Sequence, residues 1–140
     1  MPELIIVRGV PGSGKSTLAL DMWSGDRSAG VSAVVLEADM FMVNENGNYQ
    51  FDGTRLKECH QKCQQFVCME MVRQTQRIYV ANTFIRKWEA DVYLQLAKLW
   101  GYTVTVYRME GKYDNVHGVP ADRVNIMRAN MEVYPGEIYK

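Results

Sequence analysis

The amino-acid sequence predicts a three-layer α/β fold with a mostly parallel sheet, built as a single domain over residues 1–140. Three observations lead to this prediction: short apolar segments rich in β-branched residues, amphipathic segments that alternate with them, and a glycine-rich loop after the first apolar segment. Strands that alternate with helices are joined by right-handed crossovers, so helices cover both faces of a parallel sheet. No linker or internal repeat divides the chain, whose length is usual for one domain.

The first predicted strand spans residues 4–7 (LIIV), an uninterrupted apolar segment typical of strands that are buried on both faces. The glycine-rich loop follows, and a helix is expected from Lys15, with Leu18 and Met22 four residues apart on one face. Residues 31–37 (VSAVVLE) are again apolar and β-branched, which predicts a second buried strand.

Residues 38–53 are polar and contain asparagine, glycine and aromatic residues, so a long loop is expected there. Thr54 is a suitable N-cap for a helix that reaches about Thr75. Cys68 points away from the other two cysteines of this helix, so packing against the sheet is favoured over a zinc site. Three- and four-residue spacing predicts a buried helix face made of Leu56, Cys59, Cys63, Phe66 or Val67, and Met71.

Residues 77–83 (RIYVANT) and 102–108 (YTVTVYR) predict the third and fourth strands by their β-branched and alternating apolar residues. A helix is expected between them and ends at Gly101, as glycine commonly ends helices. Its predicted buried face consists of Ile85, Trp88, Val92, Leu96 and Leu99. A last helix is expected from Pro120 to about Val133, with Val124, Met127 and Met131 on one side.

Composition and charge narrow the class of protein. The chain is 47% hydrophobic and 23% charged, as in an ordinary soluble globular protein. Sixteen basic and sixteen acidic residues cancel, so no global field attracts nucleic acid or an anionic membrane, and a polyanion would need a local patch. No apolar segment is long enough for a membrane span or a signal peptide, and the grouped cysteines suit reduced thiols, so a cytoplasmic location is expected.

Residues 9–16 (GVPGSGKS) satisfy the P-loop pattern, with the required strand before it and helix after it. Backbone N–H groups of such a loop surround phosphates, and the start of the helix adds its positive dipole end. We expect Lys15 to contact the β- and γ-phosphates of a nucleoside triphosphate, ATP or GTP, and the Ser16 hydroxyl to bind Mg²⁺. The predicted phosphate-binding residues are Gly9, Pro11, Gly12, Ser13, Gly14, Lys15, Ser16 and Thr17.

Ligands of open parallel sheets bind beyond the carboxyl ends of the strands, where several polar side chains are expected. Asp39 follows the second strand and is the best placed acid for accepting a proton from a hydroxyl, although an aspartate in this position can instead cap a turn. Arg86 and Arg108 follow the third and fourth strands and are candidates for offsetting charge on a transferring phosphoryl group. Further candidates at these strand ends are Phe41, Asn82, Thr83, Lys87, Lys112 and His117.

Several motifs occur in an order that resembles the P-loop polynucleotide-kinase-like family: "GVPGSGKST", "ADMF", a helix with Cys-His, "ANT", "KWEADVY" and "HGVP". That family includes the 5′-kinase domains of phage and bacterial nucleic-acid repair enzymes. The resemblance implies that Asp39 is the general base, that Lys15 and Ser16 bind phosphate and magnesium, and that Asn82 and Thr83 match part of a "D-N-T-N" strand end.

The chain departs from this family in three places. Ala81 and Phe84 replace the acid and the last asparagine of "D-N-T-N", and Met40 and Met42 stand where an acid and an arginine are sought. The segment "MEGKYDN" is too short for the helix that carries an arginine lid in relatives, so the lid is short. Arg108, Lys112 or Arg123 would then have to supply the lid's charge.

The sequence thus predicts a kinase that transfers the γ-phosphoryl group of ATP to a hydroxyl, with a single-stranded or 5′-end polynucleotide as the first choice of acceptor. Two alternatives stay open: a kinase of a nucleoside, a small metabolite or a hydroxymethylated base, and a nucleotide-binding module without catalysis. Phe41, Tyr49 and Phe51 either stack on a base or anchor their loop. His60 either faces the acceptor or solvent, and His117 is expected to stabilise a turn.

Overall fold

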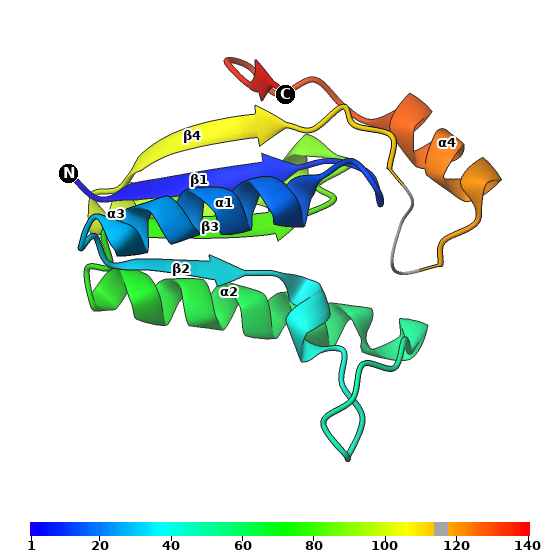
Figure 1. The fold of residues 1–140 in the computed structure, drawn as a ribbon, viewed down its shortest axis with the longest axis horizontal. Helices are drawn as coiled ribbons and strands as arrows, with labels where there is room; N and C mark the ends of the chain where they lie inside the picture. The colour runs from blue at the N-terminus through cyan, green and yellow to red at the C-terminus, as the bar shows by residue number, and fades with distance from the viewer. Residues whose placement is uncertain (114–117) are drawn as a thin grey trace.

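The computed structural model describes residues 1–113 and 118–140. Within these ranges, five strands form one sheet in the order β2-β3-β1-β4-β5, and each neighbouring pair is parallel. All the strands therefore end at the same edge of the sheet (Figure 1). The strands are β1 (Glu3–Arg8), β2 (Ala33–Leu36), β3 (Arg77–Asn82), β4 (Thr103–Arg108) and β5 (Ile138–Tyr139).

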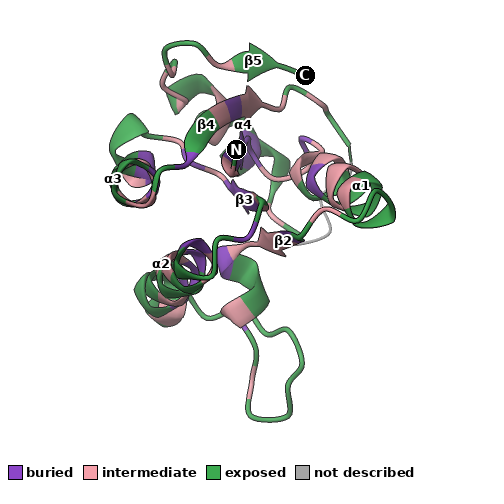
Figure 2. Cartoon of the chain, turned by 90° about the vertical axis from the view of Figure 1, so that its left-hand side faces the viewer, coloured by how far each residue is buried: buried purple, intermediate pink, exposed green. Residues whose placement is uncertain are grey.

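Helices cover both faces of this sheet, which confirms the predicted three-layer α/β fold. Helix α1 (Lys15–Ser28) lies on one face, and α2 (Leu56–Val72) and α3 (Asp91–Trp100) lie on the other, as Figure 2 shows in a view along the strands. Helix α4 (Ala121–Asn130) lies beyond the carboxyl ends of the strands (Figure 1). None of the helices in the described part of the chain has the length and hydropathy that crossing a bilayer requires.

Strand β1 is the centre of the core because both of its faces are covered. Leu4 and Ile6 pack in the cluster beneath α2 and α3, whereas Ile5 and Val7 pack in the cluster beneath α1. All four side chains are at most 1% exposed. This two-sided burial explains why the segment is continuously apolar rather than alternating.

Helix α2 buries the face that its spacing predicts, with the exception of Leu56, which is 42% exposed. Cys59, Cys63, Val67 and Met71 are fully buried, so Val67 rather than the alternative Phe66 belongs to this face. The helix begins two residues after the predicted cap, because residues 53–55 form a 3₁₀ turn. The Asp52 carboxylate caps that turn by accepting a hydrogen bond from the backbone N–H of Thr54.

The predicted buried face of α3 is wrong at three positions. Trp88, Val92 and Leu99 are 68%, 40% and 73% exposed, and the buried residues of the helix are Tyr93 and Ala97. The prediction assumed one continuous α-helix, with about 3.6 residues per turn, from residue 85 to residue 99. The structure has a 3₁₀ turn over residues 87–90 before α3 begins, so the tighter turn shifts which positions face the sheet.

Strand β5 is absent from the sequence-based prediction. It consists of two residues, and its pairing with β4 uses the backbone N–H of Lys140, which donates to the Arg108 carbonyl. Above it, the guanidinium of Arg108 lies 5.4 Å from the ring centre of Tyr139. Two residues are too few for any alternation to be recognised in a sequence.

Candidate functional site

The glycine-rich loop between β1 and α1 has the backbone of a phosphate-binding loop. Gly12 and Gly14 have φ values of +80° and +96°, in the left-handed region that side chains disfavour. Gly14 is the N-cap of α1, so the first N–H groups of the helix open toward the space in front of the loop. A Cβ on Gly9 would lie 2.3 Å from Ser13 Oγ, so any other residue there would displace the Ser13 hydroxyl.

The loop contains polar groups that fit an anion. Lys15 Nζ donates to the carbonyl of Val10 at 3.1 Å, and burial lowers the pKa of Lys15 to about 8, against the raising effect of Glu37 and Asp39. Ser13 Oγ is buried and has no hydrogen-bond partner within the described ranges. A bound phosphate would add negative charge beside the buried Lys15 ammonium group, so these residues fit the phosphates of a nucleotide.

A cleft of about 490 Å³ opens in front of this loop, at the carboxyl ends of the strands. Its volume is in the usual range for small-molecule sites. Lys15, Ser16, Asp39, Asn82 and Thr83 line it, so the structure brings these predicted residues together. The other described lining residues come from the loop and the start of α1, the connection from β2 to α2, the start of α2, the end of β3, the segment after β4, and α4 with the residue before Pro120: Pro11, Gly12, Gly14, Thr17, Glu37, Ala38, Met42, Phe51, Leu56, Cys59, His60, Ala81, Tyr113, Val119, Arg123 and Met127.

Glu37 is a site residue that the sequence reasoning missed. The Ser16 hydroxyl donates a hydrogen bond to Glu37 Oε1 at 2.5 Å, which joins the start of α1 to the residue after β2. The signal was present in the sequence, because Glu37 ends the segment predicted as the second strand, at the edge where ligands bind. A carboxylate beside this hydroxyl is a suitable oxygen ligand for Mg²⁺.

Asp39 lies in a short 3₁₀ helix, residues 38–41, directly after β2. The neighbouring strand holds this helix in place, because Asn82 Oδ1 accepts a hydrogen bond of 2.8 Å from the backbone N–H of Ala38. Asn82 is 7% exposed and its amide also donates to Cys63 Sγ at 3.8 Å. The role of Asn82 is therefore to position the segment that carries Asp39.

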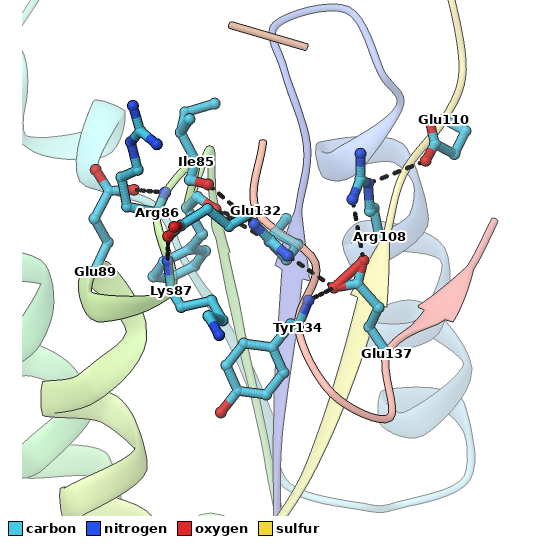
Figure 3. Close-up of polar contacts among 11 residues, drawn as sticks. Ile85, Arg86, Lys87, Glu89, Arg108, Glu110, Glu132, Tyr134 and Glu137 are labelled. Carbon is cyan, nitrogen blue, oxygen red and sulfur yellow. Dashed lines mark hydrogen bonds and ion pairs between the residues drawn. The ribbon is translucent and has the colours of Figure 1, made fainter. Parts of the chain in front are cut away.

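The two arginines predicted for charge stabilisation, Arg86 and Arg108, are not among the described residues that line the cleft. Arg108 forms ion pairs with Glu110 at 3.0 Å and with Glu137 at 3.5 Å (Figure 3). Arg86 lines a separate, smaller cavity next to Tyr134. Arg123 of α4 lines the cleft instead and is exposed. The geometry therefore favours Arg123 over the predicted pair for a contact with bound phosphate.

Arg8 is a buried arginine that the sequence reasoning did not identify, and it shares the Glu137 carboxylate with Arg108. Arg8 is 1% exposed, and its guanidinium contacts Glu137 at 2.7 Å and the carbonyl of Phe84 at 2.6 Å. Glu137 also accepts a hydrogen bond from the backbone N–H of Tyr134. The pair ties the C-terminal segment to the end of β1, immediately before the phosphate-binding loop.

The segment after β4 lies directly against the phosphate-binding loop. The backbone N–H of Tyr113 donates to the Gly12 carbonyl at 2.8 Å, and a Cβ on Gly111 would lie 2.6 Å from the Ser13 carbonyl oxygen. Lys112 is exposed and is not among the described lining residues. His117, expected to stabilise a turn, lies outside the described residues.

Comparison of the sequence with known proteins gives a family. The family model AAA_33, described as an AAA domain, matches residues 4–132. An uncharacterized protein of Pasteurella multocida, PM0531, is 31% identical over 132 residues, which cover 89% of this chain and 73% of that protein. Human NEDD4-binding protein 2 is 32% identical over 133 residues, or 89% of this chain, and the chain spans only 7% of that protein's length.

Solved kinase structures share the fold at low sequence identity. A sugar kinase from Janibacter sp. HTCC2649 has a TM-score of 0.62 and 18% identity, and the match covers 100% of this chain and 84% of the sugar kinase chain. The Mycobacterium tuberculosis APS kinase CysC in complex with AMPPNP and APS has a TM-score of 0.60 and 15% identity. This match covers 89% of this chain and 67% of the kinase chain. The structure of the Pnkp1/Rnl/Hen1 complex has a TM-score of 0.60 and 15% identity, and the match covers 89% of this chain and 38% of the matched chain. The chain therefore belongs to the AAA_33 family, and its fold is that of P-loop kinases.

Proposed function

We propose that the protein is an ATP-dependent kinase that transfers the γ-phosphoryl group to the 5′-hydroxyl of a polynucleotide. One observation carries the proposal: a single cleft is lined by the P-loop lysine and by Asp39, a carboxylate suited to accept a proton. Asp39 raises the pKa of Lys15, so the two side chains lie within electrostatic range of one another. A phosphate donor held at the loop would therefore lie beside the base that its acceptor requires.

The donor half of the cleft holds the triphosphate. Backbone N–H groups of residues 12–17 and the Lys15 ammonium group contact its phosphates, and the dipole of α1 adds to their attraction. Ser16 and Glu37 are the side chains that would bind Mg²⁺, which neutralises phosphate charge when it is bound. The APS kinase structure that shares this fold is described as a complex with AMPPNP, which supports a nucleotide in this half.

The acceptor half starts at Asp39. The acceptor hydroxyl oxygen forms a bond to the γ-phosphorus, the bond from that phosphorus to the β–γ bridging oxygen breaks, and ADP leaves. Asp39 takes the proton of the hydroxyl, and Asn82 keeps the 3₁₀ helix of Asp39 in register with the sheet. Arg123 is the arginine that we assign to the charge on the transferring group, in place of Arg86 and Arg108.

The choice of a polynucleotide rests on the order of motifs over almost the whole chain, which resembles polynucleotide kinases. The fold of the Pnkp1/Rnl/Hen1 complex agrees with this choice, although the same fold also occurs in a sugar kinase and an APS kinase. The fold is therefore compatible with several acceptors, and the acceptor has to be identified by assay.

The experiment incubates the protein with ATP labelled at the γ-phosphate and a panel of acceptors: single strands with 5′-hydroxyls, duplexes with hydroxymethylated bases, free nucleosides, and buffer alone. Label on 5′-ends is the expected result, label on another acceptor reassigns the substrate, and nucleotide binding without transfer identifies a binding module. Asp39→Asn should still bind ATP but transfer at least about 100-fold more slowly. An Asp39→Asn variant with wild-type transfer removes this residue from the mechanism.

A further inference from the structure

The cleft has two halves of different chemistry. The P-loop half is polar and contains Lys15 and Ser16, with Glu37 opposite. The other half is lined by a group of side chains that we call the apolar wall: Met42, Phe51, Leu56, Cys59, Val119 and Met127. Leu56 and Cys59 belong to the start of α2 and Met127 belongs to α4. Figure 1 shows the start of α2 and helix α4 on opposite sides of the carboxyl edge of the sheet.

Asp39 lines the cleft together with residues of both halves. Its charge raises the pKa of Lys15 on the P-loop, and it also adds to the raised pKa of Cys59, which burial causes first. Cys59 belongs to the apolar wall, so the proposed base is within electrostatic range of both halves. A hydroxyl that reaches Asp39 from the side away from the phosphates therefore belongs to a molecule that lies along the apolar wall.

The apolar wall leaves large hydrophobic side chains exposed inside a concave site. Phe51 is 63% exposed and Leu56 is 42% exposed, although Met42 and Cys59 beside them are fully buried. Exposed apolar surface in a cleft marks a place where a ligand with an apolar or aromatic part binds. An anionic backbone would find few partners here, because Lys15 and Arg123 are the only lysine or arginine side chains in the described lining.

We propose that the apolar wall binds the base and sugar of the nucleoside that carries the acceptor 5′-hydroxyl, with the base stacked on Phe51. This inference rests on the proposed kinase function and adds to it the part of the acceptor that supplies binding energy. Affinity comes from stacking of the base on the Phe51 ring rather than from a row of phosphate contacts. Every base has an aromatic face that can stack in this way. The nucleoside is either free or at the end of a strand, since both present the same ring and hydroxyl.

Salt dependence follows from this arrangement. For single strands, the logarithm of affinity falls with the logarithm of salt concentration with a slope of about −0.7 for each phosphate contact. The described lining holds two cationic side chains, Lys15 and Arg123, so it allows one or at most two phosphate contacts, which give a slope between about −0.7 and −1.4. A groove that follows the backbone over four or more phosphates would give a slope of about −3 or steeper.

The test compares Phe51→Ala and Phe51→Trp with Trp88→Ala, which removes an aromatic side chain of similar exposure, 68%, outside the cleft. Equilibrium binding of a 5′-hydroxyl oligothymidylate and of free thymidine is measured with ADP and Mg²⁺ present, together with KM and kcat for transfer. We expect Phe51→Ala to weaken binding and raise acceptor KM by about 5- to 150-fold, with unchanged KM for ATP and with Phe51→Trp restoring affinity.

Four results bear on the stacking site and on the proposed kinase function. Normal transfer to 5′-ends by Phe51→Ala, with unchanged acceptor KM, overturns the stacking site and leaves the kinase intact. Acceptor binding with a salt slope of about −3 or steeper also overturns it. If no acceptor is phosphorylated but thymidine or oligothymidylate binding still depends on Phe51, the kinase proposal fails and the binding site stands. Binding of thymidine as tight as that of the oligonucleotide assigns the site to free nucleosides.

Discussion

Replacing Lys15 by methionine tests whether the phosphate-binding loop is built around an uncompensated charge. Burial lowers the pKa of Lys15 from 10.5 to about 8, and the attraction of Glu37 and Asp39 reverses only part of this effect. The folded protein therefore holds an ammonium group at a cost that a bound phosphate would remove. Methionine keeps most of the apolar stem and deletes the charge.

The difference between the two pKa values sets the size of the effect. A fall from 10.5 to about 8 corresponds to about 3 kcal/mol against folding at neutral pH, where Lys15 is protonated in the folded and unfolded states. We therefore expect Lys15→Met to raise the free energy of unfolding of the nucleotide-free protein by up to about 3 kcal/mol. For a domain of this size the corresponding rise in Tm is roughly 10 °C.

The sign of the pH dependence is specific to a lysine with a lowered pKa. Above about pH 8 the folded wild type loses the Lys15 proton, whereas the unfolded chain keeps it until about pH 10.5. The free energy of unfolding of the wild type therefore rises between these pH values. The extra stability of Lys15→Met over the wild type decreases in the same pH range. ATP at 1,000 times Kd reverses the order, because only the wild type gains binding free energy, about 4.1 kcal/mol at that concentration.

The assay is urea denaturation at a series of pH values from 7 to 10, with and without ATP and Mg²⁺. Lys57→Met, at an exposed lysine of α2, is the control and should change stability by no more than about 0.5 kcal/mol. The reasoning is refuted if Lys15→Met is less stable than the wild type at pH 7, or if its advantage is the same at pH 7 and pH 10. ATP stabilisation of the variant equal to that of the wild type would remove Lys15 from the nucleotide site.

Two other predictions concern residues that hold the site in place. Glu137→Ala leaves the Arg8 guanidinium buried without its carboxylate, so we expect urea denaturation to show a loss of about 3–5 kcal/mol in the free energy of unfolding. The control Glu110→Ala removes an exposed carboxylate and should cost less than about 1 kcal/mol. Equal losses for the two variants would contradict the burial argument. Asn82→Ala removes the acceptor for the Ala38 N–H, so stability should fall by about 1–3 kcal/mol and kcat should fall with KM for ATP unchanged. Asn82→Asp, which keeps the oxygen, should restore most of kcat, and failure to do so argues against a positioning role.

Local sequence patterns predicted most of the fold. Residues 4–7 are apolar without interruption because β1 is covered on both faces, and the glycines of the loop are required by left-handed backbone at Gly12 and Gly14. The same loop identified Lys15 and Ser16 as phosphate and magnesium residues, and these roles stay proposals. The position of Asp39 after a strand predicted its place at the cleft, because parallel strands end at one edge.

Partners far apart in the chain could not be predicted from such patterns. The buried face of α3 depends on a 3₁₀ turn over residues 87–90, which periodicity does not reveal. Arg108 is a cation beyond a strand end in the sequence, but Glu137 pairs with it across 29 positions and keeps it out of the cleft. Strand β5 is too short to be recognised without the strand that it pairs with.

The sequence by itself determined the P-loop, the alternation of strands and helices and the acid after the second strand, because each depends on neighbours a few positions away. Only the tertiary structure decided that Ser16 contacts Glu37, that Arg123 rather than Arg108 lines the cleft, and that the residues of the apolar wall line the same cleft as Asp39. These contacts depend on strand order and helix placement, which bring together side chains separated by tens of residues.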